Sequence, residues 1–171
     1  LSDIHFFPKL KWRDGHSHAA LLTYLKQCFE DEPHLRPDLI FCTGDIAFGE
    51  LPHAPLLEQY AEAKEFFDDL LQVCGKDGVR MAKQRLFVVP GNHDIDRSCI
   101  DRDAQESLYK KTEDSSKHVD AINERFNDRQ LEFQNNIKRL ADYGKFVKEY
   151  LPHQHDENDR ICYATVLDVA G

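Results

Sequence analysis

The 171-residue sequence has no apolar stretch that approaches the length of a membrane span, and its first residues lack the basic-then-apolar pattern of a signal peptide. We therefore expect a soluble protein with no membrane partner. The sequence also lacks an excess of positive charge, because 22 Lys and Arg residues stand against 31 Asp and Glu residues, a formal net charge of −9. Without a bulk positive field, a polyanionic substrate would need local cations such as bound metal ions.

The sequence also lacks cysteines at the spacings that are typical of disulfide frameworks or metal sites. The five cysteines are an odd number with no C-x-x-C spacing, and Cys42 and Cys162 lie in apolar, strand-like runs where small thiols usually fill the core. This pattern favours a reducing, cytoplasmic setting over a secreted one. The remaining composition, 41% apolar and 31% charged, is ordinary for a single globular domain.

Strand-like and helical segments alternate over the first hundred residues. A short apolar start at Leu1 and apolar runs over residues 38–43 and 86–89 indicate three strands. Apolar residues at helical spacing fill the two intervening segments, and the second helix opens at Pro55 and closes near Gly75. This order predicts an α/β fold with a parallel sheet.

The chain looks incomplete at both ends. Only two residues precede the first polar cluster, whereas a strand of about five residues normally would. Residues 161–169 form a run of strand formers that stops at Gly171, as if a further hairpin or crossover were beginning. We expect residues 1–171 to be a single domain, truncated at both ends, within a larger polypeptide.

The region after the third strand has a different composition. Residues 95–117 are polar and charge-rich, and residues 121–151 carry an apolar stripe at helical spacing that predicts an amphipathic helix, broken at Gly144. We interpret residues 95–155 as a charged, helical insertion beside the site.

Each of the three strand-like runs is followed directly by a polar cluster. Because open α/β sheets bind ligands at the carboxyl ends of their strands, these clusters are candidate site residues. In chain order they are Asp3-Ile4-His5, Gly44-Asp45 and Gly91-Asn92-His93-Asp94. The first two are weak signals alone, since short polar residues after a strand are common in turns. Finding all three in order after three strand-like runs makes coincidence a poor explanation.

The residue types in these clusters suit a pair of divalent cations. Mixed imidazole and carboxylate ligands favour Mn²⁺, with Fe and Zn²⁺ as alternatives, over Mg²⁺ or Ca²⁺. Asp3 and His5 form one half-site, and Asp45 can bridge two ions spaced roughly 3.5–4 Å apart. Asn92 can offer its carbonyl oxygen to the second ion. His93 is then placed to protonate a leaving alkoxide or to steady phosphoryl oxygens, and Asp94 to fix its tautomer.

These clusters resemble the calcineurin-like metallophosphoesterase family, whose first signature blocks read D-x-H, G-D and G-N-H-D/E. The resemblance covers roughly the first hundred residues. By position it implies the same residue roles, with Asp3, His5, Asp45 and Asn92 on two metals and His93 with Asp94 as the catalytic pair. It also implies an α/β/β/α sandwich, of which this chain would be the incomplete N-terminal part.

One part of the family pattern is missing. Family members carry a further metal-binding His and a G-H-x-H block downstream, and neither is found here. The pair His153-Gln154-His155 has the H-x-H spacing but precedes the last strand-like run, so we interpret it as a solvated loop. A chain without the downstream ligands would bind metal weakly and turn over poorly.

The sequence favours a metal-dependent phosphoesterase in which a metal-activated water attacks a phosphodiester or phosphomonoester. Diesters are slightly favoured, because His93 supplies the proton that a poor alkoxide leaving group needs. A nucleotide, a nucleic acid or a small diester could be the substrate, and a phosphoprotein phosphatase stays open. The alternative from another class is a non-catalytic metal- or phosphate-binding sensor module of a larger signalling or defence protein.

Overall fold

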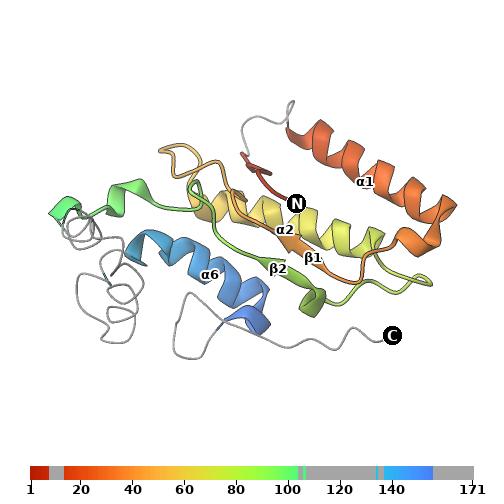
Figure 1. The fold of residues 1–171 in the computed structure, drawn as a ribbon. Helices are drawn as coiled ribbons and strands as arrows, with labels where there is room; N and C mark the ends of the chain where they lie inside the picture. The colour runs from red at the N-terminus through yellow and green to blue at the C-terminus, as the bar shows by residue number, and fades with distance from the viewer. Residues whose placement is uncertain (8–13, 104–105, 107–133, 135–136, 156–171) are drawn as a thin grey trace, which may run out of the picture. The chain divides into compact units, whose positions relative to one another are not determined.

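The computed structural model describes residues 1–7, 14–103, 106, 134 and 137–155 (Figure 1). Contacts divide the chain into two compact units, one of Leu1–Ile95 with Tyr143–Gly171 and one of Asp96–Asp142. No helix within the described ranges is long and apolar enough to cross a membrane. Cys162, the predicted strand over residues 161–169 and most of the predicted helix over residues 121–151 lie outside the described residues.

The first unit is built on parallel strand pairing. Strand β1 (Ile40–Cys42) pairs in parallel with β2 (Leu86–Val88), with Ile40 opposite Leu86. On the other side of β1, the first residues of the chain run parallel to the segment that continues from it, through a bridge between Phe6 and Ala47. The predicted α/β fold with parallel strands is thus confirmed. The sandwich and the insertion stay predictions.

The parallel strands are connected by long helices, as the sequence predicted. Helix α2 contributes a mainly apolar face to the core, which also includes Gln59 and Tyr60, and Pro55 stands at its N-terminal cap. Figure 1 shows α2 running along the two strands, and α1 packs against α2. The helices and helical turns of the described chain are α1 (Asp14–Asp31), η1 (Pro33–Leu35), α2 (Leu56–Val73), η2 (Lys83–Arg85), η3 (Arg97–Cys99), η5 (Lys138–Leu140), α6 (Ala141–Tyr150) and η6 (Pro152–Gln154).

Within the described part of the chain, side chains satisfy the outer edge of β2. The buried side chain of Gln154 accepts a hydrogen bond from the Val88 amide at 2.9 Å and donates one to the Leu86 carbonyl at 2.6 Å. The Tyr143 hydroxyl donates to the Val88 carbonyl at 3.1 Å. The prediction of a solvated loop at residues 153–155 is therefore wrong for Gln154, because its amide replaces a missing backbone partner.

Helix α6 supports the same side of the unit. It continues through Gly144, so the predicted break there is wrong, since nothing crowds this glycine and the helix has a buried face to hold it. Phe146 stacks on Tyr60 of α2, with ring centroids 4.7 Å apart and an interplanar angle of 11°. Aromatic stacking therefore links α6 to α2 in the core.

The thiol of Cys42 lies in this core and not in the site. Burial raises its pKa to about 11, so the thiol stays protonated at neutral pH. Only the thiolate is a good metal ligand, and Cys42 therefore acts as the core filler that the sequence predicted.

Candidate metal centre

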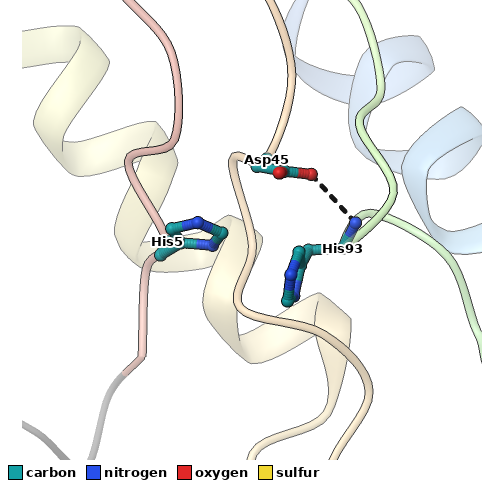
Figure 2. A group of neighbouring side chains, drawn as sticks. All are labelled: His5, Asp45 and His93. Atoms are coloured by element: carbon teal, nitrogen blue, oxygen red, sulfur yellow. Dashed lines mark hydrogen bonds between the residues drawn. The ribbon is translucent and has the colours of Figure 1, made fainter.

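Three of the predicted side chains converge on one point. His5, Asp45 and His93 each offer one potential ligand atom, and these atoms all lie within 4.8 Å of one another (Figure 2). The three residues come from separate segments, one from the start of the chain, one following β1 and one following β2. Parallel strands place their carboxyl ends at the same edge of the sheet, and this convergence is the result.

The backbone around this group is strained. Asp3, His5 and Asp45 have φ values of 53°, 54° and 51°, in the left-handed region that residues other than glycine seldom adopt. Pairing between the two segments holds them there, because the amide of Asp3 donates to the Gly44 carbonyl at 3.2 Å and the amide of His5 donates to the Asp45 carbonyl at 3.0 Å. Strain of this kind gathers at functional sites and persists only where the surroundings enforce it.

Two glycines allow the segments after β1 and β2 to approach closely. A Cβ on Gly91 would collide with the backbone nitrogen and carboxylate of Asp45, and a Cβ on Gly44 would lie 3.0 Å from the Gly91 Cα. Gly44 also has φ of 113°. This approach lets the His93 amide donate to Asp45 Oδ1 at 2.9 Å, the bond drawn in Figure 2. The carboxylate of Asp45 is therefore oriented by the turn that carries His93.

Backbone carbonyl groups orient both imidazoles. The Nδ1 of His5 lies 3.3 Å from the Ala47 carbonyl oxygen, and the Nδ1 of His93 lies 2.6 Å from that of Phe48. A carbonyl oxygen can only accept, so each Nδ1 carries a proton, and in the neutral ring the lone pair is on Nε2. Histidines that bind metal ions typically donate their other N–H to a carbonyl or carboxylate in this way. Both rings are thus held through Nδ1, which leaves Nε2 for metal binding or proton transfer.

Asp94 is used differently from the prediction that it orients His93. Its side chain is 0% exposed and accepts hydrogen bonds from the amides of Ile46, Ala47 and Gly91 at 2.9–3.0 Å. The Tyr60 hydroxyl donates to the same carboxylate at 3.1 Å. The carbonyl of Phe48, not Asp94, takes the orienting position at His93 Nδ1. The carboxylate instead holds together the two turns that carry Asp45 and His93.

The other two predicted ligands lie at the margin of the group. Asp3 is exposed, and its Oδ1 lies 3.9 Å from the Nε2 of His5. Asn92 is exposed in the turn between Gly91 and His93. Their metal-binding roles stay predictions, as do the roles assigned to His5, Asp45 and His93.

Sequence reasoning missed the groups that orient the site. Two of them are backbone carbonyls, of Ala47 and Phe48, and carbonyls leave no mark in a motif. The nearest signal is Gly49, whose φ of 123° marks the turn that brings these carbonyls to the histidines. The sequence pattern places Tyr60 on a helix face, and nothing in its neighbourhood indicates that its hydroxyl reaches Asp94.

Comparison with known proteins agrees with this geometry. The family model for calcineurin-like phosphoesterases matches residues 1–167, almost the whole chain. No curated protein and no solved structure gave a significant match. The convergent His5, Asp45 and His93 lie within the matched residues. The chain therefore belongs to the calcineurin-like phosphoesterase family.

Proposed function

We propose that the protein is a metal-dependent phosphoesterase that hydrolyses a phosphodiester or phosphomonoester with two divalent cations. The observation that carries this proposal is the convergence of His5, Asp45 and His93 from three separate segments at the carboxyl ends of parallel strands. Membership of the calcineurin-like phosphoesterase family supports the reaction class.

The donor set suits such cations. The imidazole of His5, oriented through its Nδ1, and the carboxylate of Asp45, fixed by an amide, form a mixed nitrogen and oxygen group, which Mn²⁺, Fe and Zn²⁺ accept. Asp3 and His5 would hold one cation, Asp45 would bridge, and Asn92 would hold the second. When bound, the cations would neutralise phosphoryl charge and acidify the attacking water. We expect Mn²⁺ to be the first choice.

In this proposal, His93 would be the residue that transfers protons. Its Nδ1–H is committed to the Phe48 carbonyl at 2.6 Å, so proton transfer must use Nε2. Protonated at Nε2, the ring would donate to the leaving alkoxide oxygen and would then return to the neutral form. This donation would assist cleavage because an alkoxide is a poor leaving group, and we keep diesters as the slightly favoured substrate class.

Asp45→Asn tests this proposal. Asparagine keeps an oxygen for the His93 amide but loses the negative charge needed to bridge two cations. We expect Mn²⁺-dependent hydrolysis of an aryl phosphodiester to fall by about 100-fold or more, with weaker Mn²⁺ binding by calorimetry. Asp77→Asn is the matched control, because Asp77 also has positive φ, 53°, and belongs to the turn between Lys76 and Val79.

The possible outcomes separate the functions. Turnover that requires added metal, collapses in Asp45→Asn and survives in Asp77→Asn supports the hydrolase. Metal binding without turnover of diester or monoester with Mn²⁺, Fe²⁺ or Zn²⁺ would refute it and favour the non-catalytic binding module. Faster turnover of monoesters than of diesters would keep the reaction class and correct the substrate preference.

A further inference from the structure

An exposed aromatic ring stands at the rim of the metal group. The Phe48 ring has its centroid 5.9 Å from the ring centroids of both His5 and His93, and Phe7 packs on it at 5.5 Å. Despite these neighbours, Phe48 is 42% exposed. Single exposed apolar residues are common on proteins, but this ring directly adjoins two histidines of the candidate site.

The backbone of Phe48 is fixed on both sides. Its amide donates to Gln59 Oε1 at 2.7 Å, and its carbonyl accepts from His93 Nδ1 at 2.6 Å. Gln59 is fully buried, and its Nε2 also donates to the carbonyls of Gly49 and Ala54. The ring is therefore presented beside the site by a segment with a defined position, and it does not depend on a freely moving loop.

We infer that Phe48 forms an aromatic subsite that stacks a planar substituent of the phosphoester, either an aryl group or a nucleobase. This inference rests on the proposed function, because it places the phosphoryl group at the His5, Asp45 and His93 cluster. With a formal net charge of −9, the protein has no bulk attraction for an anionic substrate. Binding energy beyond the metal ions must then come from groups such as an exposed ring, and stacking on an aromatic side chain tolerates any base or aryl ring.

The first test compares ligands that differ only in the ring. Phenylphosphonate and methylphosphonate are titrated calorimetrically into the Mn²⁺-loaded protein, which requires no turnover. We expect phenylphosphonate to bind roughly 5- to 50-fold more tightly, in line with the value of one stacked ring. In Phe48→Leu, which keeps apolar bulk but removes the aromatic face, this ratio should fall to within about twofold of one.

A control variant and a second ligand pair sharpen the result. Phe41→Leu is the matched control, because Phe41 is also exposed, at 53%, but stacks on Phe87 in the β strands instead of on the histidines. It should leave the ratio unchanged. Comparing adenosine 5′-phosphate with ribose 5-phosphate, as inhibitors of diester hydrolysis, distinguishes an aryl group from a nucleobase. A Phe48-dependent preference for the ring-bearing ligand in both pairs supports a subsite for any planar group. A Phe48-dependent preference in the adenosine pair alone assigns the nucleobase.

Three results would overturn the inference. Equal affinities within both ligand pairs in the wild type, or a preference that survives in Phe48→Leu, would remove the stacking subsite while leaving hydrolysis in place. Calorimetry that shows Mn²⁺ binding but no binding of either phosphonate would refute the proposed function and the subsite together. The failures of the two proposals are therefore distinguishable.

Discussion

Replacing Asp94 with asparagine separates two roles for this carboxylate. If it orients His93, as its place in the motif suggests, Asp94→Asn should alter the basicity of the imidazole and shift the pH profile of turnover. If it holds the two turns together, as its hydrogen bonds indicate, Asp94→Asn should lower stability and metal affinity. Asparagine has the same shape as aspartate, so packing is a constant in this comparison.

The hydrogen bonds set the size of the effect. Oδ2 of Asp94 accepts from the amides of Ile46 and Gly91, and Oδ1 accepts from the Ala47 amide and the Tyr60 hydroxyl. The best orientation of asparagine turns its NH₂ towards Tyr60, whose hydroxyl can rotate to accept. The Ala47 amide then faces a donor and loses its partner.

An unpaired buried amide costs about 1–3 kcal/mol, and each of the two remaining bonds loses about 1 kcal/mol when its acceptor becomes neutral. Removing a buried charge recovers part of this cost. We expect a net loss of about 2–4 kcal/mol for Asp94→Asn and about 1 kcal/mol for Tyr60→Phe, which removes only the hydroxyl bond. Both lie below the roughly 5–15 kcal/mol typical of domain stability, so both variants should fold.

Urea unfolding of the metal-free protein measures this loss directly, and Mn²⁺ titration measures its consequence at the site. We expect Asp94→Asn to unfold at lower urea with an unchanged slope, to bind Mn²⁺ more weakly, and to keep the pH profile of its residual turnover. The reasoning from hydrogen bonds is wrong if Asp94→Asn shifts the pH profile and keeps its free energy of unfolding within about 0.5 kcal/mol of the wild type, as is usual for a surface change.

Contacts elsewhere in the chain give three further predictions. Gly91→Ala should abolish Mn²⁺ binding and lower the free energy of unfolding by about 1–3 kcal/mol or more, because the added Cβ would collide with Asp45. At Gly144 nothing lies within 4 Å of an added Cβ, so Gly144→Ala should instead raise the free energy of unfolding by about 0.5–1 kcal/mol, measured by thermal unfolding. Gln154→Leu should lower the free energy of unfolding in urea by about 1–3 kcal/mol, since it leaves the buried Val88 amide unpaired and removes one of two side-chain nitrogens from the Leu86 carbonyl, and an unchanged midpoint would contradict this. Burial lowers the pKa of His153 below 6.5, so the stability that its neutral ring contributes is present above that pH and is lost as the pH falls. The urea midpoints measured at about pH 8 and pH 5.5 should therefore differ less in His153→Gln than in the wild type.

The sequence predicted the elements that depend on local pattern. Both helices, α1 and α2, and both strands, β1 and β2, lie where apolar periodicity and the proline and glycine signals placed them. The convergence of His5, Asp45 and His93 was also predictable, because parallel strands bring their carboxyl ends to one edge whatever the details of their loops.

What could not be predicted depends on partners distant in sequence. Asp94 adjoins His93 in the chain, which suggested a pair, but two of its three amide partners lie 47 and 48 residues away, at Ala47 and Ile46. The polar neighbours of Gln154 predict a solvent-facing side chain, yet its partners lie on β2, 66 and 68 residues away. Composition and periodicity report on burial of a segment and not on which backbone group a single side chain will reach.

The strained backbone explains why so much hydrogen bonding is concentrated behind the candidate ligands. Holding Asp3, His5 and Asp45 at positive φ costs on the order of 1–3 kcal/mol for each residue, and that cost must be offset nearby. The amides of Asp3 and His5 pair with the carbonyls of Gly44 and Asp45, and the Asp94 carboxylate fixes the backbone directly after Asp45. Because these bonds do not involve a metal ion, the geometry of the ligands is set by the folded chain itself. Metal affinity and folding stability should therefore fall together in variants behind the site, whereas a change at a ligand such as Asp45→Asn should lower metal affinity far more than stability.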